Sequence, residues 1–320
     1  MYNFKSLLGT AMEEFIELRC AQGYKRESYL YTLKNLDEIC FLHYPQEKSL
    51  TAEIVHAWIN SMSHVSSSYL YSKCCVIRNF GKFMNSGGYN AYILPDRFIK
   101  MKRRFYAHIF SDDELSRLFC AIDNFTPSAR NAFSAYQLPV IFRLIYTCGL
   151  RPKEGRLLLW RNVNLSTGEI FITNTKNKRD RIVVMSDDMR TLYCKYDELR
   201  RNKYPHSIYA FPSTNGKAYS GDWLSARFSE CWANANPFYS KNDLPHVRVY
   251  DLRHQFASAT IHRWLNEKRD LKVMLLYLQV YMGHCKLSST AQYIHMLPEH
   301  LIQSSGIDWD YMNNLIPEVE

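Results

Sequence analysis

Near the C-terminus, His284 follows a glycine and precedes Tyr293 by nine residues. Arg253 lies upstream in the segment DLRH, and Arg151 lies further upstream in the segment CGLRP. Two arginine side chains can hold the non-bridging oxygens of a phosphodiester through charge-assisted hydrogen bonds, and a phenol can attack its phosphorus. These four residues therefore predict a phosphoryl transfer that side chains carry out.

In order and spacing, these segments resemble the motifs of the tyrosine recombinases, the phage integrase family. The resemblance implies that Arg151 and Arg253 are two catalytic arginines that neutralise charge in a pentacoordinate transition state. It also implies that Tyr293 is the nucleophile of a 3′-phosphotyrosine link. His284 would hydrogen-bond a non-bridging oxygen or help to position that nucleophile, and Glu154 would orient Arg151.

The resemblance further implies a lysine on a β-hairpin that protonates the leaving 5′ oxygen. Aligning the segment that starts at Arg181 with the strand after this hairpin assigns the role to Lys176. Lys178 stays open as the alternative, because a slip of the hairpin register would move the assignment.

Tyr250 departs from the family pattern, which usually has a histidine three residues before the second arginine. A neutral phenol can donate a hydrogen bond to a phosphate oxygen, but its pKa of about 10 makes it a poor base near pH 7. His246 lacks the required offset from Arg253. We therefore expect Tyr250 to line the site, leave the general base unassigned, and treat Tyr250 as the one serious rival to Tyr293 as nucleophile.

The composition favours a polyanionic partner. The 320-residue chain carries a formal net charge of +9, which points to nucleic acid before a membrane, and the resemblance implies that this nucleic acid is double-stranded DNA. It contains no apolar run of about 18 residues and no signal peptide pattern. Its nine cysteines form no CxxC pair, which is typical of a reduced cytoplasmic protein without a zinc site. No glycine-rich phosphate loop appears, so neither ATP nor a dinucleotide is implied. Because phosphoryl transfer by these side chains needs no metal, we expect no cofactor.

Residues 1–94 carry apolar side chains at helical spacing, which predicts four helices that end at a Gly-Gly pair. In the resembling family, such a block is a SAM-like core-binding domain that holds one face of DNA. The fourth helix, which follows a run of serines and ends near Met84, carries basic and aromatic residues. These could contact phosphates and bases, or could form an ordinary solvated face. They are Tyr69, Tyr71, Lys73, Arg78 and Lys82.

A basic linker over residues 95–110 is expected to cross the DNA backbone. A capping box at residues 111–114 then opens the catalytic domain, residues 111–304. Residues 305–320 are acidic and form a tail that docks on a neighbouring subunit or on its own domain. The linker's basic residues expected to bind DNA are Lys100, Lys102, Arg103 and Arg104.

The fold class expected is mainly α with a small antiparallel β-sheet. Strands are predicted over residues 169–173 and 181–185, joined as a hairpin. Helices are predicted from Pro139 to Cys148, from Pro152 to Trp160, and from Met189 to about Lys203, and further helices continue to about residue 301.

The resemblance implies a site-specific recombinase that integrates and excises a mobile element, or that resolves DNA dimers. Four protomers would act as a homo-tetramer on two DNA duplexes, with a possible accessory directionality factor. Two alternatives stay open. One is a catalytically silent DNA-binding relative that acts as a repressor or architectural protein, and the other is a type IB topoisomerase, which shares this constellation.

Overall fold

The computed structural model describes residues 2–96, 98, 107–173, 180–240 and 242–294. The chain divides into two compact units, residues 1–105 and 106–320. The division falls inside the stretch expected as a linker, whose role stays a prediction because residues 97 and 99–106 lie outside the described part, as does the tail 305–320. No helix in the described part is long and apolar enough to cross a membrane.

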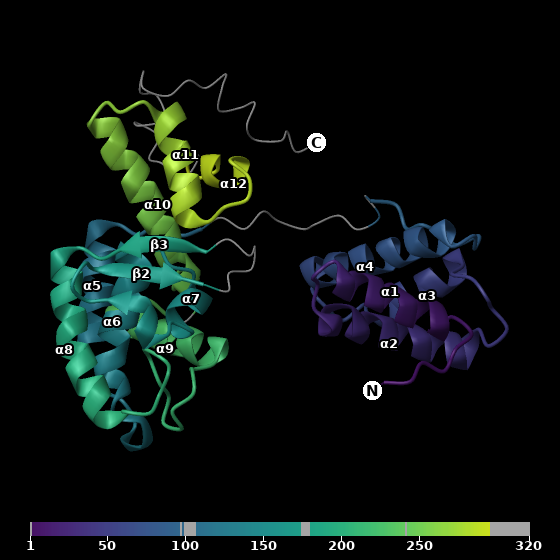
Figure 1. Ribbon diagram of the computed structural model, residues 1–320, viewed down its shortest axis with the longest axis horizontal. Coiled ribbons are helices and arrows are strands. Elements are labelled where there is room, and N and C mark those ends of the chain that lie inside the picture. Colours follow the sequence, from purple (N-terminus) through teal and green to yellow (C-terminus); the bar gives the residue numbers. More distant parts are fainter. Residues whose placement is uncertain (1, 97, 99–106, 174–179, 241, 295–320) are drawn as a thin grey trace. The chain divides into compact units, whose positions relative to one another are not determined.

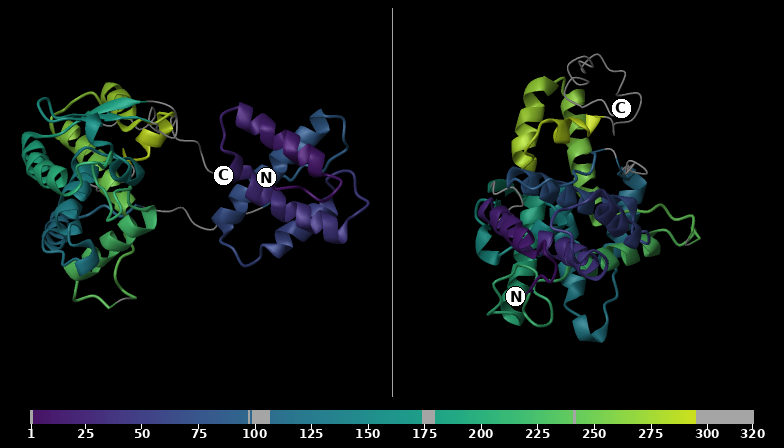
Figure 2. Two further views of the ribbon diagram at one scale, coloured as in Figure 1. Left: turned by 60° about the horizontal axis from the view of Figure 1, so that its bottom comes forward. Right: turned by 90° about the vertical axis from the view of Figure 1, so that its right-hand side faces the viewer.

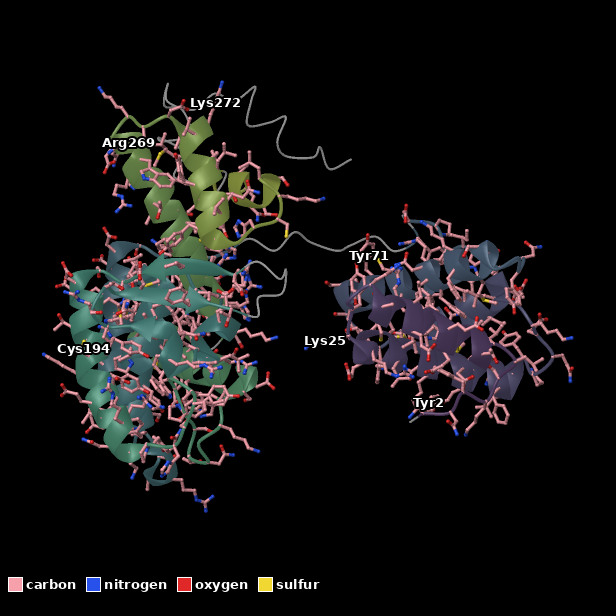
Figure 3. All side chains as sticks on the ribbon, viewed as in Figure 1. Tyr2, Lys25, Tyr71, Cys194, Arg269 and Lys272 are labelled. Carbon is pink, nitrogen blue, oxygen red and sulfur yellow. The ribbon has the colours of Figure 1, made fainter. Side chains whose placement is uncertain are left out.

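In the described part of the first unit, four helices surround one apolar core (Figure 2). They are α1 (Gly9–Ala21), α2 (Arg26–His43), α3 (Ala52–Ser61) and α4 (Ser67–Ser86). The side chain of Ser66 accepts a hydrogen bond from the backbone N–H of Tyr69 and so caps α4, whose start was predicted at this serine run. Figure 3 marks Tyr71 in the first turns of α4. The fully buried residues of the core include Met12, Phe15, Leu33, Leu36, Ile54, Trp58, Ile77 and Phe80.

The second unit combines helices with a three-stranded antiparallel sheet in the order β1-β2-β3, which confirms the predicted fold class. The strands are β1 (Val163–Asn164), β2 (Glu169–Ile172) and β3 (Arg181–Val184), and Ile170 pairs with Val183. The helices are α5 (Asp112–Asp123), α6 (Ser134–Thr147), α7 (Pro152–Arg156), α8 (Asp187–Lys203), α9 (Gly221–Ala235), α10 (Val249–Asn266), α11 (Leu271–Met282) and α12 (Ser288–Ala291).

Helix α5 begins as predicted. Ser111 accepts a hydrogen bond from the backbone of Glu114, and the Glu114 carboxylate accepts one from the backbone of Ser111. Helix α6 was expected to begin at Pro139 but already begins at Ser134, so the proline lies inside it. Burial of the surrounding apolar side chains in the core of the unit outweighs the local preference of proline for a helix start.

Helix α7 ends at Arg156, four residues before the predicted end at Trp160. The backbone beyond it pairs with a distant segment instead of continuing the helix. Ala210 N–H donates to the Leu158 carbonyl at 2.7 Å, and Trp160 N–H donates to the Ile208 carbonyl at 3.2 Å. This pairing satisfies the backbone groups that a longer helix would have used.

Helices α11 and α12 and the C-terminal part of α10 form one end of the second unit, beyond β2 and β3 (Figure 1), whereas the first turns of α10 pack into the main core of the unit. Figure 3 marks Arg269 and Lys272 at the turn between α10 and α11, at the far tip of this end. A separate apolar cluster joins α10 and α11 to the residues that follow α12, and it includes Leu275, Met282 and Tyr293. Tyr293 is therefore part of a packed core.

Gly149 links α6 to α7 in a left-handed backbone conformation, with φ of +61°. A Cβ atom at this position would lie 2.5 Å from the ring of Phe256 on α10. The glycine is thus required both by its backbone angle and by the close approach of α10.

We expect Gly149→Ala to lower the free energy of unfolding by about 3 kcal/mol, since it combines left-handed strain with a steric clash. Gly216→Ala is the matched control, because Gly216 has φ of +76° but open space around its Cα. The control should cost only about 1 kcal/mol. Urea denaturation of both variants measures the difference, and equal losses would show that the Phe256 contact is unimportant.

Candidate active site

Arg151 lies at the N-cap position of α7, immediately before Pro152. Its Nη1 donates to Glu154 Oε1 at 2.7 Å, and its backbone N–H donates to Glu154 Oε2 at 2.8 Å. Its Nη2 donates to the carbonyl of Gly283 at 2.8 Å. The side chains of Arg151 and Glu154 thus lie next to each other, and Arg151 also contacts the end of α11 at Gly283, which is 132 residues further along the chain.

Arg181, the first residue of β3, binds the same carboxylate. Its Nη1 and Nη2 donate to Glu154 Oε1 and Oε2 at 2.9 and 2.7 Å, and its Nε donates to the Tyr281 carbonyl at 2.8 Å. From the sequence alone, Arg181 had only the role of marking the strand that follows the hairpin. One signal could have revealed it, because strand alternation places Arg181 on the same face as the buried Val183.

Glu154 is held ionised between the two arginines. Burial by itself raises the pKa of this carboxyl, but hydrogen bonds and charge from Arg181, followed by hydrogen bonds from Arg151, hold the pKa at about 2. Burial would likewise lower the pKa of Arg151, but Glu154 and the nearby phenol of Tyr250 outweigh it. Tyr250 therefore lies close to Arg151, and its role in the site stays a prediction.

Arg253, on the first turn of α10, is completely buried. Its Nη1 donates to the carbonyl of Gly149 and its Nη2 donates to the carbonyl of Met282, both at 2.5 Å. Glu154 Oε2 lies 3.9 Å from Nη1. The Nε atom has no hydrogen-bond partner among the described residues. Burial lowers the pKa of Arg253, but arginine remains charged at neutral pH.

His284 follows Gly283, which ends α11 in a left-handed conformation with φ of +64°. Arg253 Nη2 lies 3.2 Å from His284 Nε2, and Thr290 Oγ1 lies 2.9 Å from Nδ1. Because a guanidinium can only donate, Nε2 accepts and Nδ1 carries the proton. Burial and the charges of Arg253 and then Arg151 lower the pKa of His284 to about 3, so the ring is neutral.

Tyr293 is 1% exposed and stacks on His284, with ring centroids 6.0 Å apart and planes 22° apart. Burial raises the pKa of its phenol to about 12, against the opposing charge of nearby Arg253. The hydroxyl is therefore protonated in this state, next to the cation that would stabilise its anion.

His254 is a further residue of the site that the sequence analysis missed. Its ring lies 5.4 Å from the ring of Tyr293 and 5.0 Å from that of Tyr250, which is one helical turn away on α10. Burial lowers its pKa to about 4, and its Nδ1 has no partner in the described part of the chain. Helical spacing of four residues from Tyr250 was the signal that could have identified it.

The structure thus brings together Arg151, Glu154, Tyr250, Arg253, His284 and Tyr293 in one unit. Lys176 and its rival Lys178 lie outside the described residues, as do Lys100, Lys102, Arg103 and Arg104. Among the described residues, no cluster of histidine, cysteine, aspartate and glutamate could hold a metal ion.

The basic residues of α4 differ in their surroundings. Lys82 is exposed, and the Lys73 ammonium lies 5.0 Å from the Tyr69 ring and 5.3 Å from the Tyr31 ring. Arg78 does not fit the phosphate contact expected from the sequence. It is buried, and its Nε and Nη2 each donate at 2.7 Å to the carbonyls of Leu94 and Pro95. Its hydrogen bonds thus hold the backbone at Leu94 and Pro95 against α4.

Comparison with known proteins gives consistent matches. Residues 109–300 match the Phage integrase family. A putative integrase/recombinase of Sinorhizobium fredii is 26% identical and covers 92% of this chain and 93% of its own length. The tyrosine recombinase XerD of Rickettsia prowazekii is 25% identical, over 90% of this chain and 93% of its own.

Solved structures resemble this chain in fold. A XerH site-specific recombinase bound to its palindromic difH substrate has a TM-score of 0.65 at 17% identity, covering 89% of this chain and 80% of its own. The Tn1549 transposon integrase in complex with transposon right end DNA also has a TM-score of 0.65, at 13% identity, covering 88% of this chain and 94% of its own.

The lowered pKa of His284 predicts how stability depends on pH. The unfolded chain binds a proton at this histidine below about pH 6.5, but the folded protein does so only near pH 3, so acid favours unfolding across that window. The stability present at pH 7 should fall by about 1–2 kcal/mol at pH 5 through this residue. His284→Gln should therefore flatten the pH dependence in urea titrations, whereas the exposed His206→Gln should leave it unchanged.

We expect Arg78 to contribute to the stability of the fold and not to contact DNA, because its donors are bound to backbone carbonyls. Arg78→Ala leaves two backbone carbonyls without buried donors and is expected to cost about 2–3 kcal/mol. Lys82→Ala, on the exposed face of the same helix, should stay within about 0.5 kcal/mol. Thermal denaturation compares the two, and similar melting temperatures would argue that the Arg78 contacts contribute little.

Proposed function

The chain belongs to the phage integrase family, and on this basis we propose that it is a site-specific DNA recombinase that cuts and rejoins strands through Tyr293. We further propose that it integrates and excises a mobile element. The observation that carries the chemistry is the convergence of Arg151, Arg253 and His284 with a buried tyrosine in one unit.

The proposed reaction begins when Tyr293 Oη attacks the phosphorus of a DNA phosphodiester. The phenol gives its proton to a general base that stays unassigned, the P–O5′ bond breaks, and the 5′ oxygen leaves with a proton from the acid, so that one proton is lost and one is gained. A 3′-phosphotyrosine link keeps the bond energy. Arg151 and Arg253 neutralise the charge that accumulates on the non-bridging oxygens. A 5′ hydroxyl of a second strand then attacks the phosphotyrosine and releases Tyr293, so this sequence consumes neither ATP nor water and uses no metal.

The protonation states in the site support this division of roles. His284 is neutral and accepts from Arg253 through Nε2, so it acts as a hydrogen-bonding and positioning group. Tyr293 loses its proton only as the reaction proceeds, and the positive charge of Arg253 favours the phenolate. Tyr250, close to Arg151, serves as a hydrogen-bond donor to a phosphate oxygen. Lys176 is proposed as the acid for the leaving oxygen.

The partners proposed are two DNA duplexes and three further copies of this chain. A lambda integrase of the same fold, with a TM-score of 0.60, has been solved as a tetramer bound to a Holliday junction. The formal charge of +9 suits a DNA ligand, and binding through phosphates should weaken with salt. An accessory protein that sets the direction of reaction is part of this proposal.

The decisive experiment uses plasmid DNA that carries the sequences flanking this gene. Wild type, Tyr293→Phe and Tyr250→Phe are incubated with it and quenched with denaturant, and protein attached to DNA 3′ ends is measured. We expect an adduct with wild type and Tyr250→Phe, and at least about a 10³-fold loss with Tyr293→Phe, because a ring without its hydroxyl has no nucleophile.

Each of the other outcomes would indicate a different nucleophile or a different function. An adduct lost only in Tyr250→Phe would make Tyr250 the nucleophile. Tight, salt-sensitive binding without any adduct would indicate a silent DNA-binding relative. Relaxation of supercoiled plasmids that lack the flanking sequences would indicate a topoisomerase.

A further inference from the structure

Glu154 has more hydrogen-bond donors than the orientation of Arg151 requires. Arg181 binds both carboxylate oxygens with its paired Nη atoms, whereas the Arg151 side chain binds one oxygen through a single Nη. The Arg181 side chain is only 5% exposed. The better-buried and two-point contact to the carboxylate therefore comes from β3.

The charges in the site show what this contact does. Three guanidinium groups, of Arg151, Arg181 and Arg253, surround one carboxylate within 4 Å, which leaves two positive charges for the phosphate. Without Arg181, the carboxylate would draw on Arg151 and Arg253 for its missing donors. Those two side chains would then be less available to a phosphodiester.

Arg181 also contacts the segment that carries His284. Its Nε donates to the Tyr281 carbonyl in the last turn of α11, and Arg151 donates to the Gly283 carbonyl two residues later. A Cβ atom at Gly283 would lie 3.3 Å from both Cδ and Nη1 of Arg181. The guanidinium thus lies against the turn from which His284 projects.

We propose that Arg181 is a positioning residue, which occupies Glu154 from β3 so that Arg151 keeps its place and its free donors for the scissile phosphate. This inference rests on the proposed function. Arg181 does not touch the DNA in this proposal, and its effect passes through Glu154.

The test is a pair of substitutions that separates charge competition from loss of structure. Arg181→Gln leaves the carboxylate of Glu154 underpaired, and we expect single-turnover adduct formation on the flanking-sequence plasmid to fall about 100-fold. Adding Glu154→Gln removes the competing charge, and the double variant should recover about tenfold over Arg181→Gln alone. Plasmid binding, measured by filter retention, should change less than about threefold throughout.

The matched control is the pair Arg143 and Asp123, which also forms a two-point contact, at 2.6 and 2.8 Å, between α6 and α5. Arg143→Gln and its double variant with Asp123→Asn should form the adduct at the wild-type rate. A double variant Arg181→Gln/Glu154→Gln that is as slow as Arg181→Gln, or plasmid binding that falls with the rate, would refute the positioning role.

A second measurement does not depend on recombination. In ¹³C spectra of DNA-free protein labelled at glutamate, Glu154 should remain ionised at pH 4 in wild type and in Arg143→Gln. In Arg181→Gln its pKa should rise by at least about one unit. An unmoved pKa would refute the inference even if wild type forms the adduct, whereas a wild type without adduct but with the shifted pKa would refute only the proposed function.

Discussion

The site depends on one buried cation, the guanidinium of Arg253, and on the two carbonyls that receive it. A fully buried charge is costly unless its donors are paired. The carbonyls of Gly149 and Met282 supply that pairing, and they lie at the C-terminal ends of α6 and α11. Helix C-termini carry unpaired carbonyls and the negative end of the helix dipole. Two helix ends therefore converge on Arg253 and stabilise its charge.

The C-terminal ends of α6 and α11 also share a backbone conformation. Each is followed by a glycine in the left-handed conformation, Gly149 after α6 and Gly283 after α11. That conformation ends a helix abruptly and lets the chain turn back. Arg151 follows the first glycine by two residues, and His284 follows the second directly. The two glycine turns thus have two effects. They direct backbone carbonyls toward Arg253, and they fix the backbone positions from which the side chains of Arg151 and His284 project.

Local signals in the sequence predict most helices and the β2–β3 pair, because each of these has a period or a capping motif. The residues that lie around Arg253 were named from the resemblance of their motifs to those of a family, and their roles stay predictions. Local signals cannot predict that Arg181 binds Glu154 across 27 residues, since that contact depends on how β3 packs against α7. The same holds for Arg78. The amphipathic pattern of α4 is visible in the sequence. Only the fold shows that the Arg78 guanidinium donates its hydrogen bonds to the carbonyls of Leu94 and Pro95. Ion pairs that join separate elements have no sequence period to reveal them.

The state of Tyr293 connects this architecture to its reactivity. With a pKa of about 12, only about one phenol in 10⁵ is ionised at pH 7, and the ring is packed between His254 and His284. In the proposed reaction, Tyr293 starts from this buried and protonated state, so it needs a neighbouring positive charge that stabilises its phenolate. In this site, the positive charge that lowers the pKa of the phenol is that of Arg253. Its Nη atoms donate to backbone carbonyls, while its Nε lacks a partner among the described residues. In the proposed reaction, the arginine that pairs with the two helix ends is thus also the one that stabilises the phenolate, so a change at Arg253 would alter both the packing of the site and its chemistry.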